Sequence, residues 1–304
     1  MVIYIPLSQL KAISMNPQLN TQPVSGLTDS GSSGPADSNV IDRARAEAFF
    51  PEGSDTSWLK DPGIIASRLF AAQFTKDKER NWGNVLQCTH YLEVANWVHN
   101  CPELRHVRDG IAAFVGYNHD LGEDFREDIQ PPRIVDACWR GSPEQKEYVL
   151  KALMKLTDPE DVSGKARLRA QIDAAQNSGD LVNYVRFADK WCSILRDLWC
   201  LQNDKKVFSD IDDKNEYFEY LRRRNLVVQN LRVDDKYKVE FLQLNKRIES
   251  IAERQLAENN VTIQSLKHYA PQLTRQLCSK LLLPVALTLR KVNSAVNRAT
   301  GIML

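Results

Sequence analysis

The sequence contains no apolar run long enough to cross a membrane. Its longest such run, Leu281–Leu287, is interrupted by Pro284, whereas a transmembrane helix needs about 20 apolar residues. The first ten residues, Met1–Leu10, contain neither Lys nor Arg, so the basic start of a secretory signal peptide is missing. We therefore expect no membrane span and no conventional secretory signal.

An excess of charge and a cysteine pair are also lacking. The 40 Lys and Arg against 39 Asp and Glu give a net charge of +1, which argues against a broad nucleic-acid surface and a cationic membrane binder. The six cysteines form no CxxC pair, so we predict mostly buried, reduced thiols in a cytoplasmic protein. With 43% hydrophobic residues, the chain can bury a full-sized core, which excludes global disorder.

Alternating strand patterns are nearly absent, and the periodicity is helical from about Asp42 onward. Apolar stripes follow one another along the chain, and Ser142-Pro143 is a typical helix start. We predict an all-α fold, a helical bundle with a C-terminal helical extension. The proposed divisions are a disordered leader over 1–41, a helical domain over 42–245 and the extension over 246–304, with a break at Asn259-Asn260.

The leader prediction depends on residues 14–40, where 21 of 27 positions are Ser, Thr, Asn, Gln, Asp, Gly or Pro. Such a segment cannot offset the entropy of ordering by burial. One interpretation is a flexible tail of a cytoplasmic protein. The other is an uncleaved, Ser-rich export leader that delivers the protein into a host cell.

The segment Asn118-His119-Asp120-Leu121-Gly122-Glu123-Asp124 carries the main chemical signal. On a helix, His119 and Glu123 are four residues apart, as are Asp120 and Asp124, so two pairs stack on one face. An imidazole followed by a carboxylate offers the mixed nitrogen and oxygen ligands that suit Mn²⁺, Fe²⁺ or Zn²⁺. The simpler alternative is a solvated acidic helix end.

Two further signals flank this segment. Asp189 interrupts a helix that otherwise has the pattern of a core helix, and a buried carboxylate is unfavourable unless it is paired or bound to a metal. His90 lies at the start of another apolar helix, where a lone histidine is also compatible with an ordinary core or surface position.

Together these residues give the order H…HD…D, with Glu123 and Asp124 extending it to HDxxED. Leu156-Thr157-Asp158, the Phe187–Lys190 FADK element and Glu216–Tyr220 (EYFEY) follow in register. Over residues 60–245 the chain resembles the HD phosphohydrolase superfamily, which implies that the predicted bundle is an HD-domain helical bundle and that 42–245 is an HD-type hydrolase domain. Within it, the hydrolase domain of RelA/SpoT alarmone enzymes and small stand-alone hydrolases of the metazoan SpoT-homologue type are the most similar.

The resemblance implies a (p)ppGpp 3′-pyrophosphohydrolase that binds one Mn²⁺ and releases pyrophosphate and GDP or GTP. It implies that the metal ligands are His90, His119, Asp120 and Asp189. It assigns Glu123 and Asp124 to positioning and deprotonating the attacking water. The implied nucleotide contacts are Arg80, Lys165, Arg169 and Tyr217.

The chain also departs from the family pattern. Ser193 stands where the family has Asn, and the loop before His90 lacks the usual proline-tyrosine pair. These changes fall in the base-reading region, so one alternative is an HD phosphatase acting on another 2′- or 3′-phosphorylated nucleotide. A second alternative is a non-catalytic HD module that binds a protein partner through its C-terminal helices.

Overall fold

The computed structural model describes residues 35–75, 78–80, 85–107, 110–125, 128–158, 164–203 and 211–278. Within these ranges the regular structure is helical, and an isolated bridge between Glu79 and Leu86 is the only β pairing. The prediction of an all-α fold is confirmed. Residues 1–34 of the predicted leader and 279–304 of the predicted extension lie outside the described ranges.

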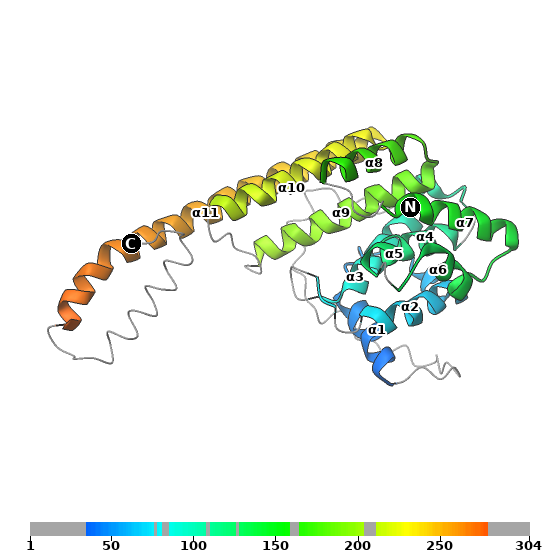
Figure 1. The fold of residues 1–304 in the computed structure, drawn as a ribbon, viewed down its shortest axis with the longest axis horizontal. Helices are drawn as coiled ribbons and strands as arrows, with labels where there is room; N and C mark the ends of the chain where they lie inside the picture. The colour runs from blue at the N-terminus through cyan, green and yellow to red at the C-terminus, as the bar shows by residue number, and fades with distance from the viewer. Residues whose placement is uncertain are drawn as a thin grey trace. The chain divides into compact units, whose positions relative to one another are not determined.

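The helices follow one another with short connections (Figure 1). They are α1 (Pro35–Glu47), η2 (Ser57–Lys60), α2 (Pro62–Thr75), α3 (Gln87–His99), η3 (Pro102–Leu104), α4 (Ile111–Asn118), α5 (Leu121–Asp124), α6 (Pro131–Cys138), α7 (Pro143–Leu156), α8 (Gly164–Gln176), α9 (Asp180–Gln202), α10 (Ile211–Asn230) and α11 (Asp235–Cys278).

The described chain divides into two compact units. The first contains the described residues up to Arg196 together with Leu226–Val239, and the second contains Asp197–Asn225 and the described residues from Glu240 onward. The leader, domain and extension boundaries at 41 and 245 remain a prediction. The helix α1 begins at Pro35, before the first of these boundaries, and it buries Val40 and Ala44.

The core of the first unit is built around α3 and α4, which pack against each other. All eight residues of α4 are buried, and α3 is buried continuously from Cys88 to Asn96. Helix α2 packs on α1, α4 and α6, and α7 packs on α4 and α6. A Cβ atom at Gly116 would lie 2.6 Å from Val98 Cγ2, so glycine is required where α4 approaches α3.

Two local predictions, one for a helix start and one for the cysteines, agree with the structure. The α7 start is a capping box: Gln145 N–H donates to Ser142 Oγ at 3.3 Å, and Ser142 N–H donates to Gln145 Oε1 at 2.9 Å. This confirms the helix start predicted from Ser142-Pro143. The thiols of Cys88, Cys101, Cys138, Cys192 and Cys200 are free and buried, as predicted.

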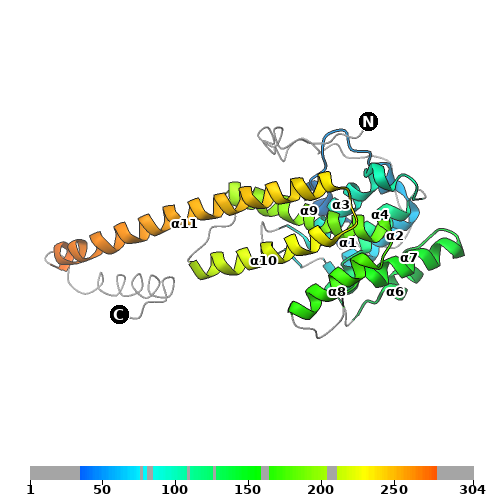
Figure 2. The ribbon, with the colours of Figure 1, turned by 90° about the horizontal axis from the view of Figure 1, so that it is seen from above.

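In the second unit α10 and α11 lie side by side (Figure 2). Lys214 Nζ donates to Glu253 Oε1 at 2.9 Å, joining the two helices. Helix α11 continues through Asn259-Asn260, so the predicted break there is wrong. The cost of asparagine in a helix interior is below about 1 kcal/mol, which a long surrounding helix outweighs. None of the helices in the described ranges is long and apolar enough for a membrane span.

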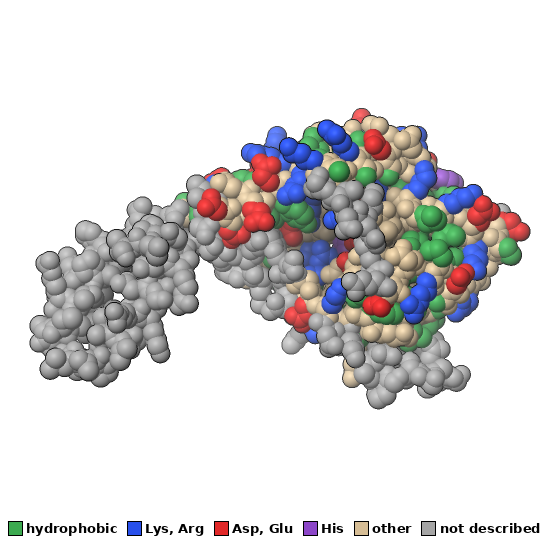
Figure 3. Space-filling model, viewed as in Figure 1, with side chains coloured by type: hydrophobic (Ala, Val, Ile, Leu, Met, Phe, Trp, Pro, Cys, Tyr) green, Lys and Arg blue, Asp and Glu red, His purple; other side chains and the backbone are tan. Residues whose placement is uncertain are grey.

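Acidic and basic side chains are interspersed on the face of the described residues seen in Figure 3.

Inside the first unit, Arg196 and Glu93 form an ion pair whose side chains are 3% and 4% exposed. Because removing one partner leaves a buried charge uncompensated, Arg196→Ala should lower the free energy of unfolding by about 3–5 kcal/mol. Urea denaturation followed by circular dichroism measures this, and a loss below 1 kcal/mol would contradict it.

Candidate metal centre

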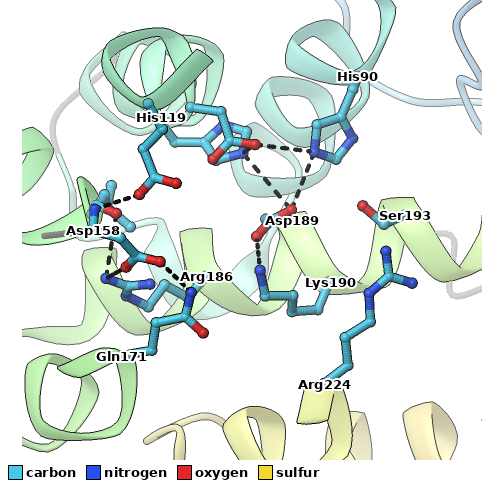
Figure 4. A network of polar contacts seen from close by, with 12 residues as sticks. His90, His119, Asp158, Gln171, Arg186, Asp189, Lys190, Ser193 and Arg224 are labelled. Atoms are coloured by element: carbon cyan, nitrogen blue, oxygen red, sulfur yellow. Dashed lines mark hydrogen bonds and ion pairs between the residues drawn. The ribbon is translucent and has the colours of Figure 1, made fainter. Parts of the chain in front are cut away.

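Four polar side chains of the first unit converge from separate elements. His90 lies in the first turn of α3, His119 and Asp120 lie between α4 and α5, and Asp189 lies in α9. Each offers one ligand atom, and these atoms all lie within 4.8 Å of one another. In Figure 4 the side chains of His90, His119 and Asp189 point toward one another. The structure therefore brings together the four residues that the sequence predicts as ligands.

The closest pairs in this cluster join an imidazole to a carboxylate. His119 Nε2 lies 3.0 Å from Asp120 Oδ2, and His90 Nε2 lies 3.2 Å from Asp189 Oδ1. The diagonal separations are 3.8 Å between His90 and Asp120 and 4.0 Å between His119 and Asp189. Two imidazole nitrogens and two carboxylate oxygens at these separations surround a space of the size that one divalent ion occupies.

The ring of His119 is oriented for metal binding by the backbone. Its Nδ1–H donates to the carbonyl oxygen of Gly116 at 2.7 Å, which in the neutral ring leaves the lone pair on Nε2. That buried Nε2 has no hydrogen-bond partner among the described residues. Histidines that bind metals typically donate their other ring N–H to a carbonyl or carboxylate oxygen in this way. The observed donor set therefore fits a divalent transition-metal ion.

Burial and the charges around the cluster shift the pKa values of its two histidines in opposite directions. Burial, and then the charge of Arg80, lower the pKa of His90 to about 3. Burial also acts against protonation of His119, but the charges of Asp120 and Asp189 outweigh it and raise the pKa of His119 to about 9. A cation in the cluster would replace that proton as the compensating charge.

The carboxylate of Asp189 is held in its ionised form. Burial acts to raise its pKa, but the charge of Lys190 and the hydrogen bond with His90 outweigh burial and hold the pKa well below the usual range. Lys190 Nζ donates to Asp189 Oδ2 at 2.6 Å. Lys190 thus occupies one oxygen of Asp189 and leaves Oδ1 facing the two histidines (Figure 4).

Glu123 lies next to the cluster with its carboxylate anchored by the backbone. The N–H of Asp158 donates to Glu123 Oε1. Burial, and then the charges of Asp120 and Asp158, raise the pKa of Glu123 to about 7. A carboxylate with a pKa near neutrality is suited to accepting and returning a proton.

Asp124 is held more tightly than Glu123. Its Oδ2 accepts hydrogen bonds from the Tyr91 hydroxyl and from Gln87 Nε2, the latter at 2.8 Å. Burial, and then the charge of Asp120, raise the pKa of Asp124. Both oxygen contacts come from α3, the helix that also carries His90, so Asp124 and His90 are positioned by the same element.

The four residues predicted to contact the nucleotide have different surroundings. Arg80 is half-buried, and its Nη2 lies 3.4 Å from Ser193 Oγ, to which it donates. Lys165 and Arg169 are exposed on α8. Tyr217 is buried in the second unit and donates its hydroxyl hydrogen to Asp197 Oδ2 at 3.2 Å. Of the four, Arg80 is the one whose charge contributes to lowering the pKa of a cluster residue, His90.

A group of residues behind Glu123 was not predicted as part of the site. The buried carboxylate of Asp158 accepts a hydrogen bond from Gln171 and faces Arg186 Nη2 at 3.5 Å (Figure 4). Arg186 also donates to the carbonyl of Lys155 at 2.8 Å. The network joins α7, α8 and α9 at the point where Asp158 contacts Glu123. The LTD motif identifies Asp158 in the sequence, but the hydrogen bond from its backbone N–H to Glu123 cannot be predicted from the sequence.

Comparisons with known proteins gave one structural likeness. No family model matches the chain, and no curated protein matches it. A solved structure described as a metazoan ortholog of SpoT that hydrolyzes ppGpp and plays a role in starvation responses matches 66% of this chain and 98% of its own. The sequence identity is 16% and the TM-score is 0.47. The geometry of the cluster, rather than this likeness, carries the functional proposal.

Proposed function

We propose that the protein is a divalent-metal-dependent phosphohydrolase that removes pyrophosphate from the ribose 3′ position of ppGpp or pppGpp. The observation that carries the proposal is the convergence of His90, His119, Asp120 and Asp189 within 4.8 Å. These side chains come from separate elements and turn two buried imidazoles toward two carboxylates, which is the arrangement that a metal ion needs. The motif resemblance selects Mn²⁺ as the metal and the alarmone as the substrate.

In the proposed site, His90, His119, Asp120 and Asp189 would hold the ion. When bound, such an ion supplies Lewis acidity that polarises a phosphate oxygen and acidifies water. Lys190 and the Gly116 carbonyl keep Asp189 and His119 in their binding orientations. The ligand cluster is thus supported by contacts that do not themselves face the ion.

Glu123 and Asp124 have distinct parts in the proposed reaction. Water adds to the phosphorus attached to the ribose 3′ oxygen, and the bond between that phosphorus and that oxygen breaks. The ribose 3′ oxygen is the leaving group and takes up a proton in exchange for the one that the water releases, so the products are pyrophosphate and GDP or GTP. Glu123 accepts the proton of the attacking water, because one of its oxygens is fixed by Asp158 N–H and its pKa is near 7. Asp124, fixed by Tyr91 and Gln87, orients that water.

Arg80 is the best-placed cation for the substrate phosphates. It is half-buried, its charge reaches His90, and it contacts Ser193 one turn beyond Asp189 in α9. Guanidinium groups bind phosphate oxygens in a bidentate manner. Lys165 and Arg169 of α8 are proposed as further phosphate contacts and Tyr217 as a nucleoside contact, on the resemblance alone.

The Arg80–Ser193 contact also supports a second candidate function. Serine is shorter than the asparagine that the family has at this position, and its hydroxyl is engaged with Arg80. This change alters the polar surface available to the nucleoside. It favours an HD phosphatase acting on another 2′- or 3′-phosphorylated nucleotide as the alternative to the guanosine alarmone.

An assay on the full chain tests both functions. The protein with Mn²⁺ is incubated with ppGpp and, separately, with other 2′- or 3′-phosphorylated nucleotides, and pyrophosphate and phosphate are quantified by ion chromatography. We expect pyrophosphate from ppGpp, loss of this activity with chelator or in His119→Ala, and full activity in His106→Ala, which changes an exposed histidine. If no nucleotide is turned over, both catalytic functions are contradicted. The remaining function is then that of a non-catalytic HD module that binds a protein partner.

The Asp158 network gives a more specific expectation. Gln171→Ala removes a donor to the buried Asp158 carboxylate, so the backbone that fixes Glu123 should be less well ordered. We expect kcat to fall about tenfold, since small displacements of a reacting group are costly, while Mn²⁺ affinity is unchanged. Gln176→Ala, at an exposed position of the same helix, is the control. Equal kcat values for the two variants would contradict the network's role.

A further inference from the structure

The last residue of α1 contacts the start of the helix that carries His90. Glu47 Oε2 accepts hydrogen bonds from the Leu86 N–H at 2.9 Å and from the Thr89 hydroxyl at 3.3 Å. Leu86 is the N-cap of α3, and His90 directly follows Thr89. Glu47 therefore satisfies a backbone donor at the start of α3, where a negative charge is also favoured by the helix dipole.

The same turn of α1 is connected to the segment that carries Arg80. Arg43 Nε lies 2.7 Å from Glu47 Oε1, and Arg43 Nη2 lies 2.7 Å from Glu79 Oε1. Glu79 pairs with Leu86 in the isolated bridge, and the N–H of Arg80 donates to the Val85 carbonyl at 2.8 Å. The backbone around Arg80 is thus linked to α1 on both sides of the bridge.

A third contact joins Glu47 to α9, the helix of Asp189. Arg196 Nη2 donates to the Glu47 carbonyl oxygen at 2.9 Å. The Arg196 guanidinium also lies over the Phe49 ring, 3.4 Å from its centroid, and pairs with buried Glu93 of α3. The end of α1 is therefore fixed to the two helices that supply His90 and Asp189.

We propose that Glu47 is a positioning residue for the candidate metal centre and its phosphate-binding arginine. Its carboxylate holds the start of α3 in register with residues 78–80, so that His90 and Arg80 keep a fixed separation. Without it, the N-terminal turn of α3 and the backbone around Arg80 lose their shared anchor. The expected effect of Glu47 on KM rests on the proposed function, whereas its expected effect on hydrogen exchange does not.

Hydrogen exchange on the full chain tests the structural consequence without activity. In Glu47→Ala, backbone amides in the peptide covering 85–90 should exchange at least about tenfold faster than in the wild type, because the acceptor of the Leu86 N–H is gone. Glu52→Ala removes an exposed carboxylate five residues further along the chain and should leave this peptide unchanged. Equal exchange in the two variants would overturn the proposal.

Kinetics with Mn²⁺ and ppGpp test the functional consequence. Glu47→Ala should raise KM for ppGpp about tenfold and weaken Mn²⁺ binding, while kcat at saturating Mn²⁺ stays within about threefold, because Arg80 and His90 lose their shared anchor and Glu123 does not. A variant that is only less stable would have a lower active fraction and an unchanged KM. An unchanged KM in Glu47→Ala would overturn the role in positioning Arg80.

Two conservative variants keep the test decisive if Glu47→Ala does not fold. Glu47→Gln retains an oxygen that can accept from the Leu86 N–H, so its KM and exchange should be close to wild type. Glu47→Asp is one methylene too short for the 2.9 Å contact and should resemble the alanine variant. The proposal would be contradicted if Glu47→Asp resembled the wild type and Glu47→Gln resembled the alanine variant. If the wild type hydrolyses no ppGpp, the proposed function fails, while the exchange contrast still decides the role of Glu47.

Discussion

Glu123→Gln should lower kcat for pyrophosphate release by about 10²–10⁴-fold, the usual contribution of a positioned general base. The amide oxygen of glutamine can still accept the hydrogen bond from Asp158 N–H, so the side chain keeps its place. What it loses is the ability to accept a proton from water. Mn²⁺ affinity should remain within about threefold of wild type, because Glu123 is outside the four-residue cluster.

Two measurements separate this expectation from a general loss of structure. Stopped-time assays with saturating ppGpp give kcat, and titration of Mn²⁺ followed by electron paramagnetic resonance gives the metal affinity. Glu147→Gln, on the exposed face of α7, is the matched control and should retain full activity. A Glu123→Gln rate within threefold of wild type would show that another group accepts the proton.

Asp189→Asn should weaken Mn²⁺ binding by more than about 100-fold and abolish hydrolysis at micromolar metal. Loss of a residue that only hydrogen-bonds a metal ligand commonly weakens metal binding by about 10–100-fold, and here an anionic candidate ligand is itself replaced by a neutral amide. The change also removes the charge partner of Lys190, leaving a cation beside the space for the metal. Both effects act in the same direction.

The variant is expected to remain folded, because asparagine has nearly the shape of aspartate. Metal content after dialysis, measured by mass spectrometry, and the helical circular dichroism signal are the two readouts. Asp173→Asn on the exposed face of α8 is the control and should retain its metal. Unchanged metal content in Asp189→Asn would remove Asp189 from the ligand set.

The all-α fold could be predicted from the sequence because the buried helices have strong apolar periodicity. The buried residues of α4 are apolar apart from Asn118, those of α3 are apolar at most positions, and Ser142 with Pro143 marks the start of α7 through a capping box. Weak propensities were less informative. Asparagine pairs do not end α11, and a polar composition did not reveal that α1 begins at Pro35 and buries Val40.

The residues of the candidate site that are marked by their side-chain chemistry could be predicted from the sequence. The contacts that depend on backbone geometry could not. His90, His119, Asp120 and Asp189 stand out as polar residues in apolar surroundings, and the structure brings them together. The orientation of α8 was not available from the sequence. Arg167 and Gln171, four residues apart, face Asp158, whereas the sequence favoured Lys165 and Arg169 of the same helix.

Contacts made through the main chain explain the remaining omissions. The N–H of Asp158 fixes Glu123, and the N–H of Leu86 binds Glu47. Neither contact depends on the identity of the residue that donates it. Lys190 is an exception, since its position next to Asp189 was visible, and only the direction of its side chain was missing.

The bond between His119 and the Gly116 carbonyl has a consequence for sequence divergence. Because the acceptor is a main-chain oxygen, the orientation of this ring is independent of the side chains at positions 117 and 118, which are tyrosine and asparagine here. The side chains of Tyr117 and Asn118 are themselves buried, so substitution there is limited by packing in the core rather than by the direction of the imidazole, and Gly116 is required for its contact with α3. The direction of the imidazole and the packing of α4 thus depend on different atoms of the same helical turn.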